Sequence, residues 1–228
     1  MKRIVASLFF ISFCVCLSFS QVPGLFRIGT GGLQGVYYPI GKLIAQGLTA
    51  RFLGPDKPAG IPETLFVAQT SGGSISNVQS LLSKETEAGL VQADVAYWAY
   101  TRQGSFEGLA EPAPVRAIAS LYPEKMQIVV RKDARIETFD QLKGKTISLD
   151  EAGSGTLAVL RILLEAHRLS EKDLKPVYLK PEFTVDRLMR NELQGFCLMS
   201  GIPALAIERL TSVAVSYTHL TLPTIYSV

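Results

Sequence analysis

The stretch TGGLQGVYYPIGKLI, residues 30–44, lies between a short apolar run and an amphipathic one. Residues 25–29 have the composition of a buried strand, and residues 35–52 have the apolar spacing of a helix. The residues expected on the buried face of that helix are Val36, Ile40, Leu43, Ile44 and Leu48. Glycines at the junction leave backbone N–H groups uncovered at a helix start, where the helix dipole favours negative charge. The stretch therefore predicts a strand-to-helix turn that can hold an anionic group.

The same order of elements occurs twice more in the first half of the chain. Residues 64–70 and 88–92 are strand-like, and a helical pattern follows each of them. The first of these helices has Ser74 as its expected N-cap residue, and the second contains Asp94 as an expected helix cap. Three strand–helix repeats predict right-handed crossovers and a parallel sheet.

Two more strand-like runs, 115–122 and 125–133, are expected to carry the chain into a second lobe. In that lobe we expect helices at 138–144, 154–170, 184–193 and 203–210, with strands at 145–149, 175–179 and 195–201. The sequence thus predicts an α/β fold of two lobes with a hinge between them. The expected organisation is a signal peptide in 1–20, a first lobe in 21–122, a second, incomplete lobe in 123–213 and an unrelated tail in 214–228.

Composition limits the class of protein. The chain has 228 residues, 47% hydrophobic and 19% charged, which is enough for a packed core in one large or two small domains. Its formal net charge is only +3, and outside the N-terminus no basic cluster is interleaved with aromatic residues. We therefore expect no nucleic-acid partner.

The N-terminal residues 1–20 have the pattern of an export signal. Lys2 and Arg3 precede an apolar run over 4–17, and small residues follow it. The run is shorter than the ~20 residues that a membrane-spanning helix needs, although an uncleaved anchor and lipid attachment at a cysteine remain alternatives. The product is expected to be a soluble periplasmic protein. Only Cys197 lies beyond the signal, which excludes an internal disulfide.

The tail at 214–228 has neither a helical nor a strand period. Translated back into codons, residues 215–224 can be written GTC TCT TAT ACA CAT CTG ACG CTG CCG ACG, which looks like a transposon adapter from sequencing libraries. We therefore expect a sequencing-adapter artefact here, with the native second lobe continuing beyond it. His219 then carries no functional meaning.

Three glycine-rich junctions, at 29–32, 70–74 and 152–156, follow strands and open helices. Each exposes backbone N–H groups and a hydroxyl at a helix start, a combination that binds carboxylates or phosphates. Ordinary turn chemistry explains any one of them without a ligand. Because ligands of open α/β sheets lie beyond the carboxyl ends of the strands, three such junctions favour one binding site between the lobes. Tyr37 or Tyr38 could donate a hydroxyl there, and Gln92 an amide.

The sequence lacks the minimal parts of a catalytic or metal site. It contains no Cys-x-x-Cys, His-Glu-x-x-His or Gly-x-Ser-x-Gly pattern. His167 is expected to be packed on the apolar side of its helix, Cys197 to be buried, and Asp150 and Glu151 to be loop acids. We therefore expect a binding protein with no catalytic residue, no metal and no cofactor.

Four segments resemble the TAXI family of solute receptors for tripartite ATP-independent periplasmic (TRAP) transporters. They are IGTGGLQGVYYPIGKLIA (28–45), QTSGGSISNVQSLLSKETEAGLVQADVAYWAY (69–100), VRAIASLYPEKMQIVVRKDARIETFDQLKGKTIS (115–148) and GSGTLAVLRILLEA (153–166). The resemblance runs over about residues 26–210. It implies a type II periplasmic binding fold, a monomeric receptor and delivery of ligand to a permease driven by an ion gradient.

The resemblance also implies a ligand class and a binding set. The ligand would be a small carboxylate, such as glutamate, a dicarboxylate or 2-oxoglutarate. The implied binding residues are Thr30, Gly32, Tyr37, Ser74, Gln92, Ser154, Gly155 and Thr156. Asn77 would support its loop, and Ala93 stands where the family often has serine. Two alternatives share the two-lobe fold: an enzyme, and a receptor for an ATP-driven importer or a sensor kinase.

Overall fold

The computed structural model describes residues 23–213 and 217–219. The expected signal peptide in 1–20 and most of the tail in 214–228 therefore lie outside the described residues. Within the described ranges, no helix combines the length and the apolar character that a membrane crossing requires.

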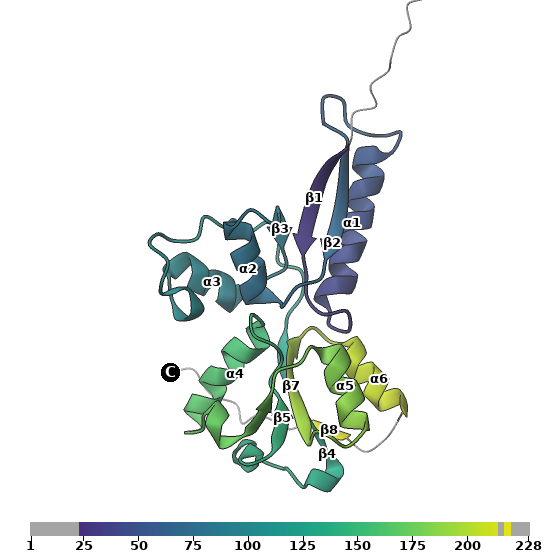
Figure 1. The fold of residues 1–228 in the computed structure, drawn as a ribbon. Helices are drawn as coiled ribbons and strands as arrows, with labels where there is room; N and C mark the ends of the chain where they lie inside the picture. The colour runs from purple at the N-terminus through teal and green to yellow at the C-terminus, as the bar shows by residue number, and fades with distance from the viewer. Residues whose placement is uncertain (1–22, 214–216, 220–228) are drawn as a thin grey trace, which may run out of the picture.

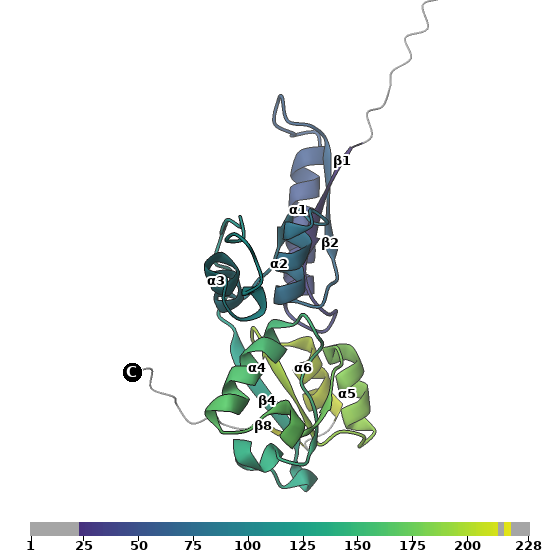
Figure 2. The same ribbon diagram turned by 60° about the vertical axis from the view of Figure 1, so that its left-hand side comes forward.

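The first lobe is built on a three-stranded parallel sheet. Its strands are β1 (Gly24–Gly29), β2 (Thr64–Gln69) and β3 (Ala88–Gly89), in the order β2-β1-β3. Each strand leads into a helix: α1 (Tyr37–Leu53), α2 (Ser74–Leu82) and α3 (Ala93–Thr101). The predicted threefold strand–helix repeat with a parallel sheet is confirmed. Figure 2 shows this lobe as an elongated unit, with α1 running along β1 and β2.

Helix α1 presents small residues to the sheet. Gly41 and Ala45 are its buried residues, and Ile40 and Ile44 pack against a cluster that contains Ala45 and Ile28 of β1. Leu43, expected on the buried face, is 64% exposed. Its position two residues from both Gly41 and Ala45 turns it to the opposite side of a helix with 3.6 residues per turn.

The second lobe contains a mixed five-stranded sheet in the order β6-β5-β7-β4-β8. Its strands are β4 (Lys125–Arg131), β5 (Thr146–Ser148), β6 (Lys175–Val177), β7 (Gly195–Ser200) and β8 (Tyr217–His219). Its helices are α4 (Gly155–Ala166), α5 (Pro181–Met189) and α6 (Leu205–Val213). Strand β4 is antiparallel to β7 and β8, whereas β5 is parallel to β6 and β7. Strand β8 lies within the expected artefact segment 214–228. Its three residues nevertheless pair with β4.

Each face of the second sheet has its own core. Ile128 and Ile147 pack with Leu160 of α4, whereas Val129 and Phe196 pack with Leu188 of α5 and with residues of α6. Successive strand residues such as Ile128 and Val129 point to opposite faces, which explains why both are buried.

Two sequence predictions about secondary structure are wrong. Residues 115–122 form no strand, and Ile118 in this segment is 89% exposed. A strand requires a neighbouring strand for its backbone hydrogen bonds, and among the described residues this segment has none. The predicted helix at 138–144 is a 3₁₀ turn at Phe139–Leu142.

The lobes meet where the helices of both begin (Figure 1). The Ser76 N–H donates to the Gly153 carbonyl oxygen at 3.0 Å, and the Ala206 N–H donates to that of Gln34 at 3.1 Å. Val36 packs against the second lobe, and Ala158 of α4 packs against the first. The chain adopts a closed arrangement in which backbone and apolar contacts join the lobes.

Candidate functional site

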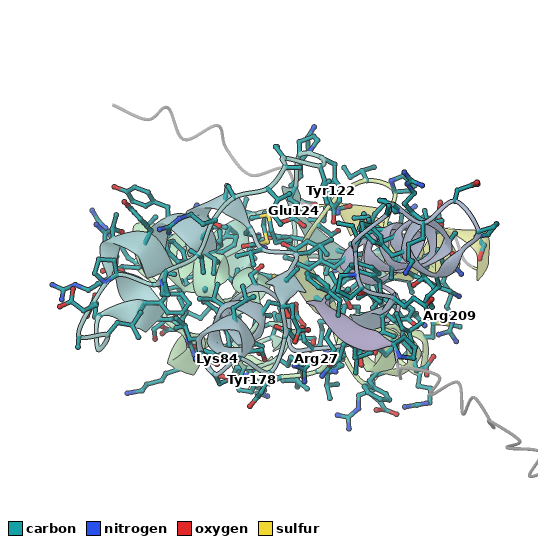
Figure 3. All side chains as sticks on the ribbon, turned by 90° about the horizontal axis from the view of Figure 1, so that it is seen from above. Arg27, Lys84, Tyr122, Glu124, Tyr178 and Arg209 are labelled. Carbon is teal, nitrogen blue, oxygen red and sulfur yellow. The ribbon has the colours of Figure 1, made fainter. Side chains whose placement is uncertain are left out.

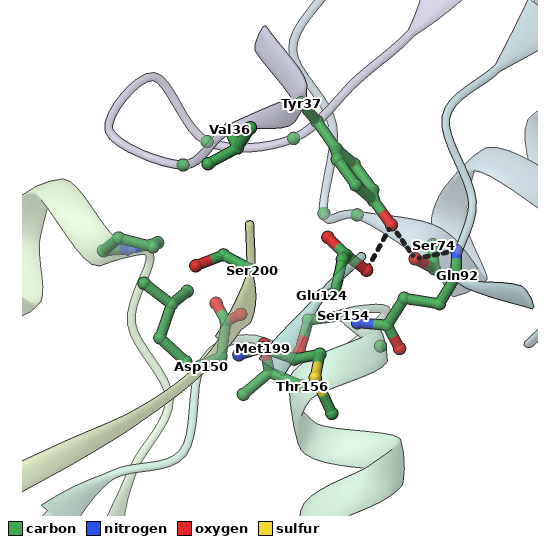
Figure 4. A pocket seen from close by; sticks show the side chains of 18 of the residues that line it. Val36, Tyr37, Ser74, Gln92, Glu124, Asp150, Ser154, Thr156, Met199 and Ser200 are labelled. Carbon is green, nitrogen blue, oxygen red and sulfur yellow. Dashed lines mark hydrogen bonds between the residues drawn. The ribbon is translucent and has the colours of Figure 1, made fainter. Parts of the chain in front are cut away.

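A pocket lies between the two lobes at this junction (Figure 4). It encloses about 50 Å³, room for about four water molecules at 10–15 Å³ each. Its lining residues are Gly31, Gly32, Gly35, Val36, Tyr37, Gly72, Gly73, Ser74, Gln92, Glu124, Asp150, Glu151, Ser154, Gly155, Thr156, Pro181, Leu198, Met199 and Ser200. All three glycine-rich junctions of the sequence contribute, so their predicted convergence is confirmed.

The helix starts at the pocket are capped in different ways. Ser154 is the N-cap of α4, and its hydroxyl accepts a hydrogen bond from the Leu157 N–H at 3.0 Å. The N-cap of α2 is Gly73, not Ser74 as predicted. Gly73 has a φ of 103°, a conformation that favours glycine. The Ser74 hydroxyl instead accepts a hydrogen bond from the Gln92 N–H at 3.1 Å. This bond joins the loop after β2 to the loop after β3.

Tyr37 of α1 contacts Glu124, which lies on the segment that links the two lobes. The Tyr37 hydroxyl donates to Glu124 Oε2 at 3.1 Å, and its oxygen lies 3.1 Å from Ser74 Oγ. Burial raises the pKa of Glu124 to about 7, opposed by the hydrogen bond from Tyr37 and reinforced by the charge of Asp94. Seen from above, Glu124 lies beside Tyr122 on the segment that joins the lobes (Figure 3).

Asp150 lies two residues after the end of β5 and lines the pocket. Its φ of 67° is in the left-handed region, and its Oδ1 accepts from the Glu151 N–H at 2.9 Å. Burial raises the pKa of Asp150 to about 6, partly offset by the hydroxyl of Thr156. Asp150 and Glu151 lie in the loop between β5 and α4, as expected of loop acids, and both also line the pocket, which the sequence did not predict.

Seven of the eight expected binding residues line this pocket: Gly32, Tyr37, Ser74, Gln92, Ser154, Gly155 and Thr156. Thr30 does not. It is fully buried, and its hydroxyl donates to the Gln69 carbonyl oxygen at 2.7 Å. The Thr30 side chain therefore holds the ends of β1 and β2 together behind the pocket.

Asn77 has the supporting role that the sequence predicted. Its Nδ2 donates to the carbonyl oxygens of Thr30 at 2.6 Å and Leu90 at 2.7 Å. A side chain at Gly29 or Gly89 would meet Asn77, at 2.6 Å and 3.1 Å respectively. The glycines thus let Asn77 insert between the ends of β1 and β3.

Sequence reasoning missed several lining residues, chiefly Glu124, Met199 and Ser200. Ser200 ends β7, so the rule that ligands lie at strand ends could have found it. Glu124 follows the Tyr-Pro pair at the expected hinge, but nothing in its spacing marked it as facing a pocket.

The remaining singled-out residues lie away from the pocket. His167 stacks on Phe139 with ring centroids 4.5 Å apart, in agreement with a packed histidine. Cys197 is buried as expected, and burial raises the pKa of its thiol to about 12. Asp94 bonds within the first turn of α3 rather than capping it, because Gln92 is the N-cap. Among the described residues, no cluster of histidine, cysteine and acidic side chains could hold a metal ion.

A family model described as the NMT1-like family matches residues 28–223. The chain belongs to the NMT1-like family. This match covers both lobes and every residue of the pocket, so the pocket is part of the family domain.

Solved structures share the fold of this NMT1-like chain. The alkanesulfonate-binding protein SsuA from Xanthomonas axonopodis pv. citri, bound to MOPS, is 18% identical with a TM-score of 0.54, over 87% of this chain and 61% of that one. The GluR0 ligand-binding core from Nostoc punctiforme, in complex with L-glutamate, is 13% identical with a TM-score of 0.51, over 89% of this chain and 80% of that one. A mutant of ArgBP from T. maritima is 18% identical with a TM-score of 0.52, over 86% of this chain and 75% of that one. The predicted type II periplasmic binding fold is confirmed, although the chain spans only 61% of the SsuA chain.

Proposed function

We propose that this protein is an exported solute receptor that captures a small carboxylate between its lobes and delivers it to the membrane subunits of a TRAP transporter. The observation that carries the proposal is the convergence of helix starts from both lobes on one pocket. Tyr37 of α1 and Ser74 of α2 approach from one lobe, and Gly155 of α4 and Pro181 of α5 from the other. Helix starts carry unpaired N–H groups and partial positive charge, which suits a carboxylate.

The proposed contacts are the seven expected residues that line the pocket, with Thr30 acting from behind it. Among the first N–H groups of α2, that of Ser76 already donates to Gly153 and that of Asn77 to Gly73. We assign the N–H groups of Ser74 and Ile75 to the ligand, together with those of Gly155 and Thr156 on α4. The Thr156 hydroxyl would complete the set of donors, while the Tyr37 hydroxyl, whose one hydrogen goes to Glu124 Oε2, would hold that carboxyl in place beside the ligand.

Capture is proposed to work by closure of the lobes. A ligand that touches helix starts on both lobes stabilises the closed arrangement over an open one, because only the closed arrangement makes both sets of contacts. The bond from the Ser76 N–H to the Gly153 carbonyl oxygen would form at the same step. No chemical change of the ligand is involved, and no cofactor is required.

The proposed place and partners follow from the sequence resemblance. The receptor would act as a monomer in the periplasm, exported by residues 1–20, and dock on a permease driven by an ion gradient. A receptor for an ATP-driven importer is the second candidate, because one structure of this fold is named as the substrate-binding protein of an amino acid ABC transporter. Co-purification with membrane subunits of each transporter type distinguishes the two.

Thermal unfolding with a ligand panel tests the receptor function. We expect glutamate, 2-oxoglutarate or succinate to stabilise the chain, whereas glucose does not. A ligand at a hundred times its dissociation constant adds about 2.7 kcal/mol. Tyr37→Phe should weaken the effect, and Tyr38→Phe, a neighbour outside the pocket, should not. Taurine tests a sulfonate as the alternative anion, and the absence of any shift across the panel contradicts the proposal.

A further inference from the structure

The lining of the pocket has an unbalanced set of charged side chains. Three acids, Glu124, Asp150 and Glu151, contribute to it. Among the described residues that line the pocket there is no lysine, arginine or histidine. Lys180 lies next to the pocket residue Pro181, and its Nζ is 3.5 Å from Glu151 Oε1, so it compensates one of the three acids. Glu124 and Asp150 are left to face the ligand.

Glu124 is held as an acceptor aimed at the pocket. The hydrogen bond from the Tyr37 hydroxyl uses Oε2 and fixes the plane of the carboxyl group. The other oxygen is directed into the pocket, and the carboxyl of Asp150 also points into it from the second lobe (Figure 4). The acceptors of the pocket thus come from the linking segment and from the loop before α4, and they lie beside the donors at the helix starts.

These two sets of groups match a ligand that carries both signs of charge. The helix starts can hold one carboxylate. A second anionic group would enter a half-buried space that already contains two carboxyls and no base, which raises the cost of burying it. An amino group removes that cost, because its N–H groups donate to the carboxyl oxygens and its charge offsets theirs.

We infer that Glu124 determines the specificity of this pocket: it accepts the cationic amino group of an α-amino acid and disfavours dianionic carboxylates. The inference rests on the proposed receptor function, and it narrows the ligand to carboxylates that bear an amino group. Asp150 assists from the opposite lobe, so that closure brings a second carboxyl to the same ligand.

Matched ligand pairs test this inference by calorimetry on the whole chain. L-glutamate is compared with glutarate, and L-alanine with propionate, because the members of each pair differ only in the amino group. In the unmodified protein we expect the amino acid of at least one pair to bind at least about tenfold more tightly than its partner. In Glu124→Gln, which keeps an acceptor for Tyr37, that ratio should fall at least about fivefold.

Two further variants make the result interpretable. Glu165→Gln, an exposed site on α4, should leave the ratio unchanged. Glu124→Asp keeps the charge but shortens the side chain, and should give an intermediate ratio even if Glu124→Gln does not fold. Tighter binding of glutarate or propionate, or an unchanged ratio in Glu124→Gln and Glu124→Asp, overturns the role of Glu124 while the receptor function stands. Failure of every compound in the pairs and of the thermal panel contradicts the receptor function itself.

Discussion

At the residue scale, close approach between the lobes depends on Gly155. A Cβ at this position would lie 2.3 Å from Gln92 Oε1, and Gln92 is only 8% exposed. The Gly155→Ala side chain must therefore displace the Gln92 amide or hold the lobes apart. We expect Gly155→Ala to increase the radius of gyration in X-ray solution scattering and to weaken ligand binding about tenfold or more.

A double-mutant comparison identifies the cause of that effect. In the Gln92→Ala background the clash is absent, so adding Gly155→Ala should change neither compactness nor affinity further. Gly47 offers a matched control, because a Cβ there meets nothing within 4 Å. Gly47→Ala should stabilise α1 by about 0.5–1 kcal/mol. Strictly additive effects of Gly155→Ala and Gln92→Ala would show that the contact between them does not control closure.

At the scale of elements, the first lobe depends on Asn77 to join the ends of β1 and β3. Strand β3 has only two residues, so side-chain bonds contribute to its position. Asn77→Ala leaves the carbonyl oxygens of Thr30 and Leu90 without these donors, at a cost of about 1–3 kcal/mol. Chemical denaturation measures the loss, and hydrogen exchange should show it at Leu90, whose N–H pairs with Gly29.

Gln79→Ala provides the control on the same helix. Gln79 is exposed on α2, and alanine is a good helix former, so its replacement should leave stability within about 0.5 kcal/mol. If Asn77→Ala lowered the free energy of unfolding no more than Gln79→Ala does, the proposed role of Asn77 in joining β1 and β3 would be wrong.

At the scale of the whole molecule, the junction between the lobes should make stability depend on pH. The pKa of Glu124 rises from an ordinary 4.5 to about 7 because of burial. The groups that face it are Tyr37 on α1, Asp94 on α3 and Tyr122 on its own segment, and burial also raises the pKa of both tyrosines, which stay neutral. Between pH 4.5 and 7 the folded chain holds a proton that the unfolded chain has lost. Stability therefore falls as pH rises through this window and levels off above it.

Melting temperatures of the unmodified protein and of Glu124→Gln, measured from pH 4.5 to 8, check this prediction. The unmodified protein should lose stability relative to the variant as pH rises, with most of the change complete near pH 7. Asp150, whose pKa burial raises to about 6, adds a similar dependence that Asp150→Asn removes. A constant difference between the unmodified protein and Glu124→Gln across the range contradicts the assigned role of Glu124.

Local patterns in the sequence determined the lobes and most of the helices and strands. The strand–helix repeats around the glycine junctions predicted the parallel first sheet. The rule that ligands lie beyond the carboxyl ends of strands predicted that three loops line one pocket. Those features depend on periodicity and turn chemistry, which act between residues close together in the chain.

Only the tertiary structure decided the features that depend on distant neighbours. Residues 115–122 have strand composition but no strand to pair with among the described residues, and Leu43 has an apolar side chain that α1 turns outward. Thr30 lies behind the pocket, while Glu124 enters it, because the path of the linking segment and the closure of the lobes fix which side chains face inward. Burial and charge at such a junction depend on contacts made across the whole fold, and no local pattern encodes them.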